Sequence, residues 1–461
     1  MPRPALLLCL SLVACAGAPP EARRAEALLE RGDYAGARSA ADKGLERAPR
    51  DPLLWRLKMR ALLGAGEARG AVALYRSWRD LRGQEDPAAL RAMARTTLWQ
   101  GLRARSAAIQ TGAVQAIERL ELEELSPEVA ELVASEEPLV AAAAASALLT
   151  AHQNAPQVLV ELLRSDDPAV RVLAVDGIGR KAGEHARADL EPMLNDRDAR
   201  VRSAAAGAVV RFAEGAALVR LYTMARRDPD GPVRARILRG LATRDVDGRV
   251  ELARQAATRD PYLGARHAAV VLLASTDTAE ASAALDRLVR SRDLHIALAA
   301  AAERGGDKAV FERALADAAW TTRAAALNAV HAAPRPLALA LAGRGIVDRR
   351  AEVRLAAARL FMRLEQPERA RSELRSALAG GDALLRLDAA IDLLRLGDER
   401  GLAVLDRLAH SASPGVRGAA VRAHAAVGRT TAGLVAGLAD PQPELRLAAA
   451  ETLLALLDDD S

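Results

Sequence analysis

The side chains best suited to metal or acid–base chemistry in this sequence are its seven histidines. They are scattered along the chain, at His152, His185, His267, His295, His331, His410 and His424. A zinc site needs three or four ligands that usually come in closely spaced pairs, and the histidines show no such spacing. The sequence also contains neither a G-x-x-x-x-G-K-[ST] phosphate loop nor a G-x-S-x-G nucleophile elbow. We therefore predict no metal, no cofactor and no catalytic residue.

The two cysteines, Cys9 and Cys15, both lie near the start of the sequence, in and just after an apolar run at residues 5–14. This run follows a short basic start and is too short to span a bilayer as a helix, which takes about 20 apolar residues. It is typical of the central region of a secretory signal peptide. The chain is therefore predicted to be exported. Because it holds no later cysteine, the exported part has no disulfide to form.

The residues LVAC at positions 12–15 resemble the lipobox of bacterial lipoproteins. The resemblance implies that residues 1–14 are a signal peptide, that Cys15 carries fatty acids such as palmitate, and that residues 15–20 are the lipidated start and a short tether. Two or three acyl chains anchor a protein stably to a membrane. Ala16 follows the cysteine, which in this family implies an outer-membrane location, and we expect the protein to face the periplasm. The alternative is an ordinary signal peptide in which Cys15 has no role.

The charge of the chain argues against nucleic acid as a partner. The 65 basic and 60 acidic side chains leave a net charge of only +5 over 461 residues, whereas nucleic-acid-binding domains concentrate basic residues on one face. No later segment is apolar over the length that a membrane-spanning helix needs. We expect a soluble body that is tethered to the membrane by its lipid, with protein partners and no small-molecule substrate.

The composition and the spacing of residues predict that the chain is built from short helical repeats, and these repeats must position any binding site. Aromatic residues make up 2% of the sequence and apolar residues 51%, which is typical of helices that pack closely on alanine and leucine. In the first part, Gly32 and Gly66 are 34 residues apart, and so are Ala37 and Ala71. This period resembles the tetratricopeptide repeat, with glycine at the turn between two helices and alanine where the second helix packs. We assign residues 21–100 to such repeats.

A second pattern, V-R-x-x-A-x-x-x-L after a frequent Asp-Pro start, continues to the end of the chain. Its anchor residues recur at steps of 28 to 32 residues, at Arg171, Arg202, Arg234, Arg266, His295, Arg323, Arg354, Arg386, Arg417 and Arg446. The pattern resembles short HEAT repeats of the kind seen in phycobiliprotein-lyase-like proteins, and we assign residues 101–461 to them. The two resemblances together imply an all-α fold, a right-handed α-solenoid of stacked helical hairpins.

Several anchor arginines follow an aspartate by four residues, a spacing that suits ion pairs between neighbouring repeats. We interpret these residues as a structural ladder rather than a ligand site. The predicted ladder residues are Asp167, Arg171, Asp198, Arg202, Asp230, Arg234, Arg354, Arg386, Arg417 and Arg446.

The candidate binding residues are Arg56 and Arg60, because the first helix of each tetratricopeptide unit lines the groove of the family. We expect them to bind an acidic peptide of a partner. The predicted function is that of a non-catalytic scaffold or assembly lipoprotein of the bacterial envelope, which binds protein partners through its repeat surface. The alternative is an enzyme built on a HEAT-repeat groove, lyase-like or hydroxylase-like. Some HEAT-repeat hydroxylases bind iron through His-Glu dipeptides, and no histidine of this chain precedes a glutamate.

Overall fold

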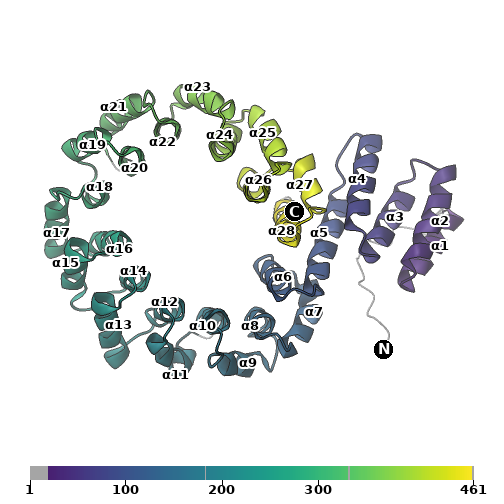
Figure 1. Cartoon of the computed structure of the whole chain (residues 1–461), viewed down its shortest axis with the longest axis horizontal. Coiled ribbons are helices and arrows are strands. Elements are labelled where there is room, and N and C mark those ends of the chain that lie inside the picture. The colour runs from purple at the N-terminus through teal and green to yellow at the C-terminus, as the bar shows by residue number, and fades with distance from the viewer. Residues whose placement is uncertain (1–18, 182, 331–332, 459–461) are drawn as a thin grey trace. The chain divides into compact units, whose positions relative to one another are not determined.

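The computed structural model describes residues 19–181, 183–330 and 333–458 (Figure 1). These residues form 28 α-helices and a few single 3₁₀ turns, with no β-strand among them. The prediction of an all-α fold of helical hairpins is therefore confirmed. Cys15 and the predicted signal peptide lie outside the described residues. No described helix combines the length and the hydropathy that a membrane span requires.

The chain divides into two compact units, and the first of them is built from both ends of the sequence. Among the described residues, unit 1 comprises 19–129 and 399–458, and unit 2 comprises those between 130 and 398. The helices of unit 1 are α1 (Pro20–Glu30), α2 (Tyr34–Arg47), α3 (Pro52–Gly64), α4 (Ala68–Arg82), α5 (Pro87–Leu102), α6 (Ala107–Arg119), α25 (Arg400–Ala409), α26 (Pro414–Val427), α27 (Ala432–Gly437) and α28 (Pro443–Asp458). The short helix α7 (Ser126–Glu131) crosses the boundary.

Unit 2 contains a longer series of helices in the same up-and-down order. They are α8 (Pro138–Ala147), α9 (Ala155–Leu162), α10 (Pro168–Lys181), α11 (Arg187–Leu190), α12 (Ala199–Val209), α13 (Gly215–Arg227), α14 (Gly231–Leu241), α15 (Arg249–Arg259), α16 (Leu263–Ala274), α17 (Ala279–Val289), α18 (Leu294–Glu303), α19 (Lys308–Leu315), α20 (Trp320–Ala329), α21 (Arg335–Gly345), α22 (Ala351–Arg363), α23 (Pro367–Leu378) and α24 (Ala383–Arg395).

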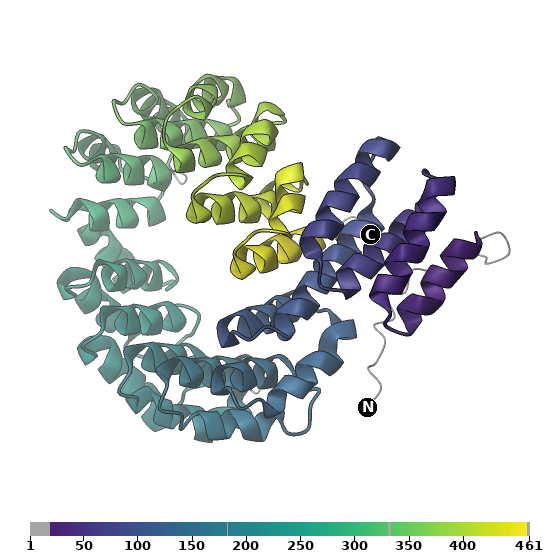
Figure 2. The same ribbon diagram turned by 45° about the vertical axis from the view of Figure 1, so that its right-hand side comes forward.

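The hairpins of unit 2 stack so that alternate helices form two layers. The even-numbered helices from α8 to α24 follow one another in one layer, and the odd-numbered helices from α9 to α23 form the other (Figures 1 and 2). Small side chains allow this close stacking. A Cβ atom added to Gly177 of α10 would lie 2.6 Å from the Ser146 hydroxyl oxygen of α8. The layered stack of alanine-rich hairpins is an α-solenoid.

Aspartates begin many of the helices. Asp51 accepts hydrogen bonds from the backbone N–H groups of Leu53 and Leu54, at 2.8 and 3.1 Å, just ahead of Pro52 at the first position of α3. Such a cap satisfies donors that the helix itself leaves unpaired, and proline lacks the N–H that would need a partner there. The sequence therefore specifies these helix starts locally.

The first two hairpins of unit 1 show why the 34-residue spacing matters. Gly32 and Gly66 have φ angles of 74° and 81°, which glycine adopts without strain at the end of a helix. Ala37 and Ala71 are both fully buried in the second helix of their hairpins. The structure thus supplies a local reason for each repeated residue, while the tetratricopeptide label itself stays a prediction.

The last helix of the chain packs against helices from its first quarter. Helix α28 lies on α5 and α6 within unit 1. A Cβ added to Gly101 of α5 would lie 2.8 Å from Cδ2 of Leu447 in α28, so the two helices touch where glycine leaves room. The Arg119 guanidinium donates from Nε and Nη2 to the Glu451 carboxylate at 2.6 and 3.0 Å. Helix α28 therefore packs on two sides, against α26 and against α5 with α6.

Candidate partner-binding site

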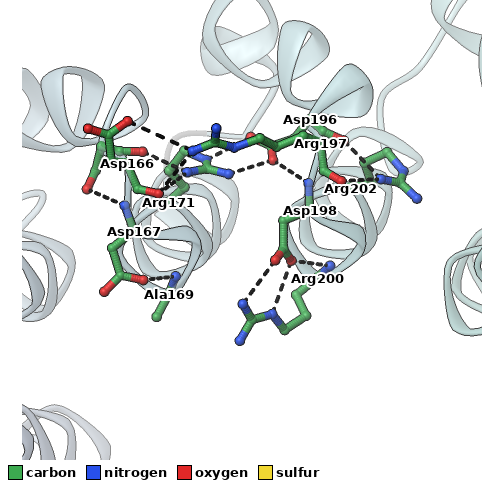
Figure 3. Close-up of polar contacts among 10 residues, drawn as sticks. Asp166, Asp167, Ala169, Arg171, Asp196, Arg197, Asp198, Arg200 and Arg202 are labelled. Carbon is green, nitrogen blue, oxygen red and sulfur yellow. Dashed lines mark hydrogen bonds and ion pairs between the residues drawn. The ribbon is translucent and has the colours of Figure 1, made fainter.

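Neighbouring repeats of unit 2 are joined by bidentate ion pairs. Arg171 at the start of α10 donates from Nε and Nη2 to the two carboxylate oxygens of Asp196, at 2.8 and 2.7 Å (Figure 3). Its Nη1 also donates to the carbonyl oxygen of Ser165, at 2.7 Å, across its own turn. The side chains of both ion-pair partners are less than a tenth exposed. Each such arginine therefore ties two repeats and one turn together.

Similar ion pairs recur along the chain, although Arg266 and Arg354 each donate a single hydrogen bond to their acid, and we call this series the arginine ladder. Its other members are Arg202–Asp228, Arg234–Asp260, Arg266–Asp293, Arg323–Asp348, Arg354–Glu373 and, in unit 1, Arg417–Asp440. The distances between nitrogen and oxygen range from 2.6 to 2.9 Å. Such charge-assisted pairs are among the stronger hydrogen bonds in proteins.

The aspartates predicted for the ladder have a different position. Asp198 caps α12 by accepting from the backbone N–H of Arg200 at 2.8 Å, and Asp230 caps α14 by accepting from that of Val233 at 3.0 Å. Asp167 accepts from the N–H of Ala169 at the start of α10. An aspartate four residues before a helical arginine faces the free N–H groups of the first turn. The ladder acceptor is instead a second acidic residue, usually 23 to 27 positions after the arginine.

Two predicted ladder arginines have no acidic partner in the described structure. The Nε atom of Arg386 is buried and makes no hydrogen bond with any described residue. Asp382, four residues earlier, caps α24 through the N–H groups of Leu384 and Leu385. Arg446 donates to the carbonyl oxygens of Asp440 and Pro441, at 2.8 and 3.3 Å. Arg446 therefore keeps the contact with its own turn, and Arg386 keeps only the residue type. Neither makes the ion pair between repeats with a described residue.

Two carboxylates of the ladder, Asp348 and Asp196, have lowered pKa values. Hydrogen bonds from Arg323 hold the pKa of Asp348 below its usual range, although partial burial opposes the shift. Burial raises the pKa of Asp196, but the hydrogen bonds from Arg171 and from the Asp198 N–H outweigh it and leave the pKa lowered. A carboxylate with a lowered pKa and two guanidinium hydrogen bonds is a weak base. The ladder is therefore suited to structure rather than to proton transfer.

A groove opens in unit 2 beside one rung of the ladder, between the C-terminal ends of α13 and α15. Its volume is about 350 Å³. The apolar lining comes from Ala225, Leu252, Ala256 and Pro261, and the charged lining from Arg226, Arg227, Asp228, Arg234, Arg259 and Asp260. Four arginines and two aspartates give this lining a net charge of +2. We call it the α13–α15 groove.

Both aspartates of the α13–α15 groove are already paired with ladder arginines. Asp228 accepts from Arg202, at 2.9 Å to each oxygen, and Asp260 accepts from Arg234 at 2.6 and 2.7 Å. The exposed arginines of the lining, Arg226, Arg227 and Arg259, have no acid within ion-pairing distance among the residues that the structure describes. The groove therefore presents unpaired guanidinium groups beside buried apolar side chains.

The residues predicted to bind a partner, Arg56 and Arg60, are both next to acids within unit 1. The Arg56 Nε lies 3.5 Å from the carboxylate of Asp86, which is 3% exposed. Arg60 lies 4.0 Å from Glu26. The cavity that they line has a volume of about 10 Å³, close to the limit for a single water molecule. Their role in binding stays a prediction, but Arg56 also has a structural contact that the sequence did not reveal.

Two of the described histidines, His267 and His295, lie close enough to interact electrostatically. His424 is fully buried in α26, where its Nδ1 lies 2.8 Å from the Ala420 carbonyl oxygen and its Nε2 lies 2.8 Å from the Thr431 hydroxyl. Burial lowers the pKa of His424. No group of three or more histidines, cysteines, aspartates or glutamates in the described ranges could hold a metal ion. His331 lies outside those ranges.

Comparisons with known proteins find the HEAT-repeat family in part of the chain. Residues 155–242, which run from α9 to the turn after α14, match this family. A search of curated proteins finds no match. Among solved structures, yeast importin-beta is 12% identical, with coverage of 96% of this chain and 83% of that one and a TM-score of 0.38. Human deoxyhypusine hydroxylase is 17% identical, with coverage of 61% and 99% and a TM-score of 0.24. The α13–α15 groove begins within the matched HEAT segment.

Proposed function

We propose that this chain is a lipoprotein of the bacterial outer membrane, facing the periplasm, that acts as a non-catalytic scaffold. In this proposal the acylated Cys15 anchors it, and the surface of its helical repeats binds protein partners of the cell envelope. The anchor rests on the sequence LVAC at residues 12–15 and on the apolar run before it. Acylation at two or three positions would hold the protein on the membrane without a spanning helix.

The observation that carries the scaffold proposal is that the charged side chains between repeats pair with one another in the arginine ladder. Its carboxylates are bound by arginines, as Asp196 is by Arg171, and they hold repeats together. The α13–α15 groove beside the ladder contains arginines, paired aspartates and a glutamine, and none of its lining residues is a serine, cysteine or histidine. This chemistry suits binding better than nucleophilic catalysis. An extended stack of repeats offers a broad surface for such binding.

The anchor is tested by substituting each cysteine in turn in cells that express the full chain. Cys15→Ser should abolish labelling with palmitate and move the protein from the membrane to the soluble periplasmic fraction. Cys9→Ser is the matched control, because this residue lies within the predicted signal peptide and should change neither result. Membrane retention of Cys15→Ser in high salt would contradict the lipid anchor.

Partner binding is tested separately by crosslinking in intact cells, followed by mass spectrometry of the captured proteins. The proposal expects recurrent crosslinks between the repeat surface and envelope proteins. A reproducible turnover of a small molecule by the purified protein would contradict the scaffold role.

A further inference from the structure

We propose that the α13–α15 groove binds an acidic peptide segment of a partner protein. The inference rests on the proposed scaffold function and adds the place and the chemistry of the contact. It assigns three residues outside the arginine ladder, Arg226, Arg227 and Arg259, as the groups that recognise the peptide carboxylates.

The shape of the groove suits a segment rather than a folded surface. Its volume of about 350 Å³ falls at the small end of ligand pockets, which measure about 300–1,000 Å³. Ala225, Leu252 and Ala256 are buried and provide an apolar base, while the three arginines are exposed. A few consecutive side chains of a peptide, with a small apolar residue among the acidic ones, would fill this space.

The charge of the groove favours an anion even when the neighbouring helix ends and acidic side chains are counted. The C-termini of α13 and α15 each carry the equivalent of about −0.5 charge, which the three arginines exceed. The nearest further acid on α15, Glu251, already accepts hydrogen bonds from Arg254 at 2.6 and 2.7 Å and from Gln255. Asp228 and Asp260 are paired with ladder arginines. The positive charge of Arg227 and Arg259 is thus left for a ligand, whereas Arg226 shares its charge with Glu251.

Carboxylates of a peptide match these groups better than the phosphates of a nucleic acid do. Guanidinium groups bind carboxylates through two parallel hydrogen bonds, so they provide geometry as well as charge. Single-stranded nucleic acid is usually held by aromatic rings that stack on its bases. The lining of the α13–α15 groove contains no aromatic residue.

The test measures binding of a fluorescent ten-residue peptide, in which glutamate alternates with alanine, to the purified full-length protein in detergent. The double variant Arg227→Ala with Arg259→Ala removes two of the three arginines. Arg226 is kept, because its guanidinium lies 5.9 Å from the centre of the Tyr222 ring. The matched control is Arg287→Ala with Arg290→Ala. These residues are exposed at the same end of α17 and do not line the groove.

The double variant should weaken binding of the peptide by on the order of tenfold, since each exposed ion pair contributes a few-fold. The control variant should bind like the native protein and have the same melting curve as the groove variant. A peptide with glutamine in place of glutamate should bind weakly, and added salt should weaken the glutamate peptide. Equal binding by both variants, equal binding of both peptides, or tighter binding of a single-stranded oligonucleotide at the same arginines would overturn the inference. If only this peptide test fails, partners that crosslink elsewhere on the chain would still support the scaffold role. If no partner crosslinks at all, the scaffold role itself is contradicted.

Discussion

Arg234 donates from Nε and Nη2 to both carboxylate oxygens of Asp260, at 2.7 and 2.6 Å, although the two residues are 26 positions apart. The side chains are 7% and 6% exposed, so neither charge has much access to water. Arg234 also donates to the carbonyl oxygen of Asp228 at 2.6 Å. This pair joins α14 to the turn between α15 and α16, and with the other rungs it holds the stack of repeats together.

Removal of the acid from this pair should cost more stability than removal of the cap in the same repeat. Asp260→Ala leaves a buried guanidinium without its partner, which should lower the free energy of unfolding by about 3 kcal/mol or more. Asp230→Ala removes only the cap of α14 and should cost about 1 kcal/mol. Denaturant unfolding followed by circular dichroism compares the two. Similar losses would contradict the assignment of Asp260, rather than Asp230, to the ladder.

Charge reversal at Arg56 should destabilise unit 1, unlike the nearly neutral effect expected of an exposed binding residue. Asp86 is buried, and besides its contact with Arg56 it accepts from the Trp78 indole and from Arg82. Arg56→Glu would place a second negative charge beside it and should cost more than about 1 kcal/mol. Arg60→Glu is the control, with a cost below about 0.5 kcal/mol because Glu26 is more exposed and farther away. Equal melting temperatures would contradict the role of Arg56.

Stability should fall as the pH drops from 7 to 5, with His424 as one cause. Burial lowers the pKa of His424 in the folded chain, whereas an unfolded chain protonates histidine near pH 6.5. Between these two pKa values the unfolded state binds more protons, so its population rises as the pH falls. His424→Gln should reduce this slope in denaturant midpoints measured at pH 5, 6 and 7. His410→Gln, at an exposed position in the same unit, should leave the slope unchanged; an identical slope in both variants would rule out His424 as the cause.

The contact between α5 and α28 should be sensitive to one added methyl group. Gly101→Ala would bring a Cβ within 2.8 Å of both Leu447 Cδ2 and Ala113 Cβ, and such overpacking typically costs about 1–3 kcal/mol. Gly112→Ala, in α6, would meet Leu447 at 3.4 Å, an ordinary contact. This control should be neutral or stabilising, since alanine favours helices by up to about 1 kcal/mol over glycine. Hydrogen exchange in α28 should therefore rise only in Gly101→Ala. Faster exchange in both variants, or in neither, would contradict the packing described.

The repeat pattern specifies local structure well, because caps, turns and the Ala/Leu stripe depend on residues close in sequence. Gly32 and Gly66 illustrate this, as does the position of Arg171. The ladder acceptor was missed because two aspartates stand two positions apart, as Asp196 and Asp198 do, and only the geometry of the helix start decides which of them faces the cap. An Asp-x-Asp pattern stands ahead of Arg202 and ahead of Arg234, and at these two repeats it is the signal that was available for the acceptor.

The remaining features depend on residues that no local pattern brings together. The α13–α15 groove forms because the ends of two helices stand side by side, and its arginines look in sequence like ordinary residues of a helix end. The contact of Arg119 with Glu451 spans 332 positions. Neither follows from a repeat period, since the period describes the relation of each hairpin to its neighbour only.

The place of α28 on α5 also has a consequence for how the protein is made. A ribosome adds about 5–20 residues per second, so α5 emerges tens of seconds before the helix that covers it. All residues of unit 2 are added during that time, while unit 1 still lacks its second half. Pairing of such distant segments is a slow step, because the loop between them must first close. The buried face of α5 is therefore the surface most in need of protection during synthesis, and a chaperone that recognises it would act before the last helix arrives.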